Sequence, residues 1–174
     1  MTHKELCVVA CRWLAGINRR HLVALFRESH YLLGEQADAF AVWSPVGVTH
    51  MVECKVSRSD FLADKHKPWR KNPEQGLGAI RSYLTLPGVI RDKSEVPDCW
   101  NWYEYNEETD SLVARFVPDP PEWMGQSHFF ANRRNGNGEW ELFWLYQRSK
   151  WWKRDLNLYT KPVNCRFPKE VEDD

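Results

Sequence analysis

The sequence lacks the features that mark secreted, membrane-spanning or zinc-ribbon proteins. Its 174 residues include no apolar run of membrane-spanning length, and its start has neither the apolar stretch nor the cleavage site of a signal peptide. The five cysteines are an odd number with no Cys-x-x-Cys pair, which argues against a disulfide framework and a zinc ribbon. We therefore expect a cytoplasmic protein with no membrane partner.

The chain also lacks a net charge, because 24 basic residues balance 24 acidic ones. Total charge therefore predicts no polyanionic partner, but the charge is unevenly placed. Residues 55–81 carry seven basic side chains against three acidic ones, whereas residues 82–122 carry three against nine. A local basic segment matters more to a phosphate backbone than the total charge does.

Several common catalytic motifs are absent too. There is no glycine-rich phosphate loop, no Gly-x-Ser-x-Gly elbow and no His-Glu-x-x-His motif, and the six histidines show no metal-ligand spacing. What is present is a hydrophobic fraction of 43% and an aromatic fraction of 14%, which indicate a globular chain. The ten tryptophans fit a core, base-stacking platforms or a partner surface, and composition does not choose among these.

The first third of the chain predicts one helix and then strands. Apolar residues recur at helical intervals over 3–15, with Gly16 as a plausible C′ residue. The apolar block at 21–27 suits a buried strand or a short helix, and turn-forming residues on both sides favour the strand. Segments 37–43 and 48–56 alternate as strands do and are joined by a Pro- and Gly-containing turn.

The rest of the chain predicts further strands and a second region rich in aromatic residues. We expect one domain over residues 1–174, with its core at about 3–117 and an aromatic helical extension at about 136–155. The other predicted elements are a short helix at 57–64, a loop marked by Pro68 and Pro73, a strand at 80–86, and a hairpin formed by 100–105 and 112–117.

The combination of Asp38 with Glu53-Cys54-Lys55 is the candidate catalytic constellation. Alternation along a strand sends Glu53 and Lys55 to one face, which we expect to be exposed, and sends Cys54 to the core. A hairpin turning at 45–46 places Asp38 directly opposite Glu53, although a bulge or a longer loop would shift this register. Two facing carboxylates repel each other unless a cation lies between them.

These residues predict a metal site suited to phosphodiester hydrolysis. Asp38, Glu53 and the backbone carbonyl of Cys54 offer the oxygen ligands that Mg²⁺ (or Mn²⁺) prefers. The metal would acidify a water molecule, and Lys55 would orient that water or stabilise developing negative charge. The alternative is a surface hairpin carrying an ordinary Glu–Lys pair. Glu35 is either a further ligand of the site or a polar residue at the start of a strand.

Basic residues close to this constellation are candidates for contacts with nucleic acid. They follow the Glu-x-Lys motif directly, where they could neutralise phosphates, and the alternative is a solvated charged surface. The candidates are Arg58, Lys65, Lys67, Arg70, Lys71 and Arg81.

The sequence over about residues 20–105 resembles a known nuclease family. Gly34-Glu35-x-x-Asp38, followed by the run from Glu53 through Lys65, is similar to the core of MmcB-like proteins of the PD-(D/E)XK nuclease superfamily, and the stretch 72–90 is similar to phage-type members. The resemblance implies an α/β, restriction-endonuclease-like core, with a central mixed β-sheet flanked by helices in the order α-β-β-β-α-β. It also puts Asp38, Glu53 and Lys55 on the three motif positions, although Ala37 replaces the motif's proline.

The expected function is that of a Mg²⁺-dependent nuclease acting on DNA, in repair, recombination or phage–host conflict. Many nucleases of this type dimerise to cut two strands, so a homodimer is also considered. The alternative is a non-catalytic module that binds nucleic acid or protein, for example a phage anti-defence protein, on a nuclease scaffold.

Overall fold

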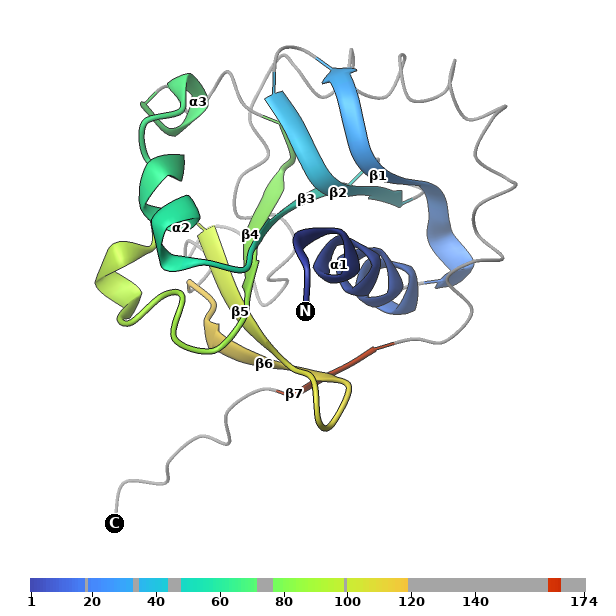
Figure 1. Ribbon diagram of the computed structural model, residues 1–174. Helices are drawn as coiled ribbons and strands as arrows, with labels where there is room; N and C mark the ends of the chain where they lie inside the picture. The colour runs from blue at the N-terminus through green and yellow to red at the C-terminus, as the bar shows by residue number, and fades with distance from the viewer. Residues whose placement is uncertain are drawn as a thin grey trace.

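The structure is a computed structural model that describes residues 1–17, 19–32, 35–43, 48–71, 77–98, 100–118 and 163–166 (Figure 1). The aromatic helix predicted at 136–155 lies outside the described residues. Within them, no helix is both long and apolar enough to cross a membrane.

A mixed β-sheet forms the centre of the described chain, with its strands in sequence order from one edge to the other. The first three strands pair antiparallel, β3, β4 and β5 pair parallel, β5 and β6 pair antiparallel, and β7 runs parallel to β6. The strands are β1 (Leu22–Leu32), β2 (Glu35–Trp43), β3 (Val48–Lys55), β4 (Ile80–Thr85), β5 (Trp100–Asn106), β6 (Ser111–Phe116) and β7 (Asn164–Arg166).

Helices cover both faces of this sheet (Figure 1). Helix α1 (His3–Ile17) packs on one face, while α2 (Arg58–Asp64) and α3 (Pro68–Lys71) form the crossover from β3 to β4 on the other. Two short 3₁₀ turns, η1 (Arg19–His21) and η3 (Lys93–Glu95), lie in the connections. The expected α/β class and the element order α-β-β-β-α-β are therefore confirmed.

Some boundaries differ from the sequence prediction. Helix α1 includes Gly16 and ends at Ile17, so Gly16 is not its C′ residue. Residues 22–27 of the ambiguous block belong to β1, because they pair with β2, while His21 ends the η1 turn. A single helical turn begins at Pro68, where a loop was predicted, since proline is well tolerated at the first position of a helix.

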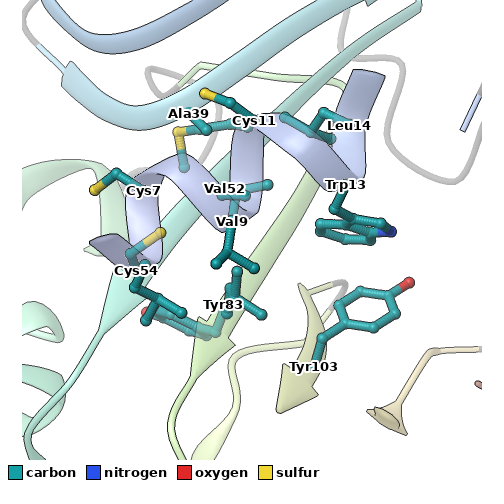
Figure 2. Packing of buried hydrophobic residues seen from close by; sticks show 14 of the residues in the cluster. Cys7, Val9, Cys11, Trp13, Leu14, Ala39, Val52, Cys54, Tyr83 and Tyr103 are labelled. Carbon is teal, nitrogen blue, oxygen red and sulfur yellow. The ribbon is translucent and has the colours of Figure 1, made fainter. Parts of the chain in front are cut away.

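The α1 side of the sheet is an apolar core (Figure 2). Small side chains on β2, Ala39 among them, let the helix approach the sheet closely, and Leu14 is fully buried between them. The ring of Trp13 packs against Tyr103 with centroids 4.5 Å apart and against His50 with centroids 5.3 Å apart. This face fixes the position of the start of α1, which lies beside Asp38.

The opposite side of β3 is polar but equally buried. Glu53 and Lys55 are only 1% and 4% exposed, so the prediction that they lie on an exposed face is wrong. The segment Arg58–Lys71, which contains α2 and α3, covers them and contributes its own charged side chains. Strand alternation gave the correct division of residues between faces but not the presence of this cover.

Gly78, just before β4, is a position that requires glycine. Its φ of +80° is left-handed, and an added Cβ would lie 2.8 Å from the Ile80 carbonyl oxygen and 2.9 Å from the Cβ of Met51. A side chain there would meet both backbone strain and a clash. The close approach of this segment to Met51 lets β4 pair with β3 beside the site.

Candidate active site

The β2–β3 hairpin brings the two predicted carboxylates together. Its pairs run from Trp43 opposite Val48 to Ala39 opposite Val52, which is the predicted register; extended by one residue, it places Asp38 opposite Glu53. Asp38 Oδ2 accepts a hydrogen bond of 2.8 Å from the Cys54 backbone N–H. Burial, together with the nearby Asp38 carboxylate, raises the pKa of Glu53 above its usual value.

Three cations surround the Glu53 carboxylate. Its Oε2 lies 3.5 Å from Lys55 Nζ and 3.1 Å from Lys67 Nζ, and its Oε1 lies 3.2 Å from Arg70 Nη2. Among the described residues, Glu53 Oε1 has no hydrogen-bond partner. The carboxylate therefore has strong electrostatic support but keeps an oxygen whose hydrogen-bonding capacity is unused.

Asp64, the last residue of the helix predicted at 57–64, joins this group. Its fully buried carboxylate lies 3.1 Å from Lys55 Nζ and 2.7 Å from Lys67 Nζ, and it accepts hydrogen bonds of 2.6 Å from Arg70 Nε and Tyr83 Oη. Burial opposes its ionisation, but the charges of Arg70 and Lys55 prevail and hold the pKa of Asp64 below its usual range. Asp64 thus positions the ammonium group of Lys55.

The electrostatics of this group decide what Lys55 can do. Burial lowers the pKa of its amine, but Glu53 and Asp64 have the larger combined effect and raise it above the usual value. Lys55 therefore stays protonated at neutral pH. It can stabilise negative charge or donate a hydrogen bond, but it cannot take a proton from a water molecule.

Glu35 is fully buried, and both oxygens of its carboxylate accept hydrogen bonds from the protein. Its Oε1 accepts a hydrogen bond of 2.7 Å from Arg70 Nη1, and its Oε2 accepts one of 2.6 Å from the Leu77 backbone N–H. These contacts tie α3 and the start of the β4 segment to β2. The structure therefore places Glu35 as an anchor of Arg70, on the far side of that guanidinium from Asp64.

The six candidate nucleic-acid contacts separate into three arginines that are engaged in contacts within the protein and three lysines that reach the surface. Arg70 and Arg81 are buried, with exposed fractions of 3% for the Arg70 side chain and 5% for Arg81, and they bind carboxylates and backbone carbonyls respectively, so neither reaches a phosphate backbone in this conformation. Arg58 pairs with Glu95 and donates to the Val89 carbonyl. The remaining three, Lys65, Lys67 and Lys71, are at least partly exposed beside the site.

Sequence reasoning missed His3. Its Nε2 lies 3.2 Å from Asp38 Oδ2, and the hydrogen bond to Asp38 is the main reason that the pKa of His3 rises to about 9. The ring also lies against Cys7 Sγ, at 3.7 Å from Nδ1. The sequence feature that could have identified His3 is its spacing from Cys7, since residues four apart lie on the same face of a helix.

Comparison with known proteins supports the fold and leaves the site open. No family model matches the chain, and no curated protein does. A solved structure of a protein of unknown function from Silicibacter pomeroyi is similar, with a TM-score of 0.54 and 15% sequence identity, over 90% of this chain and 92% of that one. At this identity the likeness shows the shared fold, a mixed sheet flanked by helices.

Proposed function

We propose that this chain is a metal-dependent nuclease of the PD-(D/E)XK type, which hydrolyses phosphodiester bonds in DNA. The observation that carries the proposal is the convergence of Asp38 and Glu53 beside a protonated, buried Lys55. Two adjacent carboxylates with a neighbouring ammonium supply the charges that this chemistry needs.

The side chains present fit a hard divalent cation. Asp38, Glu53 and the Cys54 carbonyl would hold Mg²⁺ or Mn²⁺, and among the described residues Glu53 Oε1 has no hydrogen-bond partner. Lys67 Nζ, 3.1 Å from the other oxygen of Glu53, supplies positive charge at the same carboxylate, and its side chain is one-third exposed, so it can move away. When bound, the metal would acidify a water molecule and stabilise charge on the phosphate.

The chain's own residues have distinct roles in this proposal. The Cys54 amide holds the Asp38 carboxylate in place, and Asp64 holds the Lys55 ammonium. Lys55 stabilises the negative charge that develops on the phosphate. The exposed Lys65 and Lys71 neutralise backbone phosphates on the surface next to the site. Such an activity suits DNA repair, recombination or phage–host conflict.

Cleavage of labelled DNA tests this proposal. Single-stranded, duplex and branched substrates are incubated with Mg²⁺ or Mn²⁺ and with wild type, Asp38→Asn, Lys55→Ala or the control Lys93→Ala, whose side chain lies on the exposed η3 turn. We expect metal-dependent cutting that falls at least a hundredfold in the two site variants and is unchanged in the control. Equal cutting by all four proteins would contradict the proposal.

The ion-pair network also favours a second candidate, a non-catalytic binding module on the same scaffold. Lys55, Lys67 and Arg70 already compensate Glu53 and Asp64, so the folded state does not depend on a metal ion. In that case wild type would bind DNA or a protein without cutting, and Asp38→Asn and Lys55→Ala would behave as wild type does. The same assay therefore separates the two candidates.

A further inference from the structure

The first two turns of α1 and the first half of β2 bring three donor groups of different chemistry around one point. His3, Cys7 and Asp38 each offer one ligand atom, and these atoms lie within 4.8 Å of one another. The Nε2 atom of His3 is 3.2 Å from Asp38 Oδ2 and 3.9 Å from Cys7 Sγ. Imidazole nitrogen, thiol sulfur and carboxylate oxygen are the three ligand types that zinc takes in proteins.

The spacing is close to that of a tetrahedral site. Bond lengths of about 2.0–2.1 Å for Zn–N and Zn–O and about 2.3 Å for Zn–S imply separations of roughly 3.4 Å between N and O and roughly 3.6 Å between N and S. The observed 3.2 Å and 3.9 Å differ from these by a few tenths of an ångström. The ligand atoms of Cys7 and Asp38 lie within 4.8 Å of each other, so metal binding requires side-chain rotation of Asp38 as well as of the partly exposed His3 ring.

We propose that His3, Cys7 and Asp38 form a binding site for a divalent late transition metal, Zn²⁺, with water as the fourth ligand. A thiolate and an imidazole prefer such an ion to Mg²⁺, which takes oxygen ligands and keeps its own waters. The site is therefore chemically different from the oxygen-lined site of Asp38 and Glu53. The side chain of His3 is 38% exposed, so the ion and its water can enter from solvent.

The surroundings of Cys7 support a built site. Burial, together with the nearby Cys7, raises the pKa of the Cys54 thiol, and the Cys54 amide holds Asp38, so one residue contacts two of the three ligands. Figure 2 shows Cys7 and Cys54 on facing elements, with Cys11 one turn further along α1. Cys11 instead lies 3.8 Å from the Phe26 carbonyl oxygen and provides a matched control for the same helix and the same chemistry.

Cobalt spectroscopy of the full chain tests the site without reference to catalysis. Co²⁺ is titrated into wild type, Cys7→Ala, His3→Ala and Cys11→Ala, and the thiolate-to-cobalt charge-transfer absorption is recorded. We expect one equivalent to give the band in wild type and Cys11→Ala, Zn²⁺ to displace it, Cys7→Ala to lose it, and His3→Ala to bind at least tenfold more weakly. If wild type gives no band, or if Cys7→Ala gives the same band, the site does not exist.

His3→Ala keeps the test decisive if Cys7→Ala fails to fold, because the His3 side chain is partly exposed. Unchanged Co²⁺ affinity in His3→Ala would then overturn the proposal. One consequence rests on the proposed nuclease function: since Asp38 belongs to both sites, Zn²⁺ inhibits Mg²⁺-dependent cleavage in wild type and much less in Cys7→Ala. Equal inhibition of both would place the inhibitory zinc elsewhere, whereas absence of cleavage concerns the nuclease proposal alone.

Discussion

On the α1 side of the sheet the buried side chains are apolar, aromatic or sulfur-containing, whereas the α2–α3 side of β3 also buries the charged Glu53 and Lys55 together with Asp64. Both sides exclude water to a similar degree, since Cys54 is 0% exposed and its neighbours Glu53 and Lys55 are 1% and 4% exposed. The difference teaches that burial alone does not define the core of this chain. One face stabilises the fold, and the other holds charges that the fold must compensate.

The compensation on the polar face is a matched set. Arg70 contacts Glu35, Glu53 and Asp64 and also stacks on the Trp100 ring, 4.2 Å from its centroid. Buried ion pairs rarely stabilise a protein more than apolar residues of the same size would. We infer that this face is kept polar for chemistry, and three substitutions test how the two faces differ.

The largest effect is expected for Arg70→Met, which removes the central cation of the polar face. Three buried carboxylates then lose a partner, so the free energy of unfolding should fall by about 3–5 kcal/mol in urea denaturation. The control is Lys71→Met at the next position, which is exposed and should change stability by less than about 0.5 kcal/mol. Similar small effects of both would mean that the charged network does not determine the stability of this face.

A smaller effect is expected where the polar face packs tightly against the backbone. Met51 lies two residues before Glu53 on β3 and so shares its face, and an added Cβ at Gly78 would clash with it. Gly78→Ala should cost about 3 kcal/mol, from strain and overpacking together. Gly88 has nearly the same φ of +81° but open space around it, so Gly88→Ala should cost only about 1 kcal/mol. Equal costs in thermal or urea unfolding would show that packing adds nothing to the backbone strain.

The apolar face buries the imidazole of His50, and its effect should appear as a dependence of stability on pH in the acidic range. Burial lowers the pKa of His50 to about 3, and its Nε2 lies 2.7 Å from Ser82 Oγ. Below pH 6.5 His50 is protonated in the unfolded chain but stays neutral in the folded chain. The free energy of unfolding therefore falls as the pH falls. His50 alone should remove about 2 kcal/mol between pH 7 and pH 5.

Urea unfolding at a series of pH values measures this loss. His50→Gln should flatten the decline relative to wild type, and His66→Gln, at an exposed position, should leave the decline unchanged. If wild type and His50→Gln lose stability in parallel, His50 is not held in its neutral form by the apolar face.

Local patterns were sufficient to predict the hairpin and its register. Alternation along 37–43 and 48–56, with a short turn between them, determines which residues face each other, so the register followed from counting; the observed pairs end at Ala39 and Val52, one residue before Asp38 and Glu53. The element order implied by the family resemblance was likewise correct, and it agrees with the strand that the turn residues on both sides favoured for the ambiguous block at 21–27.

Long-range contacts were not predictable in the same way. The segment that buries Glu53 and Lys55 is held by the hydrogen bond from Arg70 to Glu35, which lies 35 positions earlier in the chain. A contact between residues so far apart cannot be predicted from a local sequence pattern. From the sequence alone, a basic residue such as Arg70 is expected at the surface, because lysine and arginine are seldom buried unless they are paired. His3 was missed for a related reason, since its partner Asp38 lies on a different element.

The response of thermal stability to Mg²⁺ tests the central claim, that the polar face is built to hold a divalent cation. A Mg²⁺ concentration ten times the dissociation constant adds about 1.4 kcal/mol, which corresponds to a rise of roughly 4 °C in the melting temperature. The account predicts this rise for wild type and its loss in Glu53→Gln, which keeps the shape of the side chain but removes its charge. No rise in wild type, or an equal rise in Glu53→Gln, would contradict it.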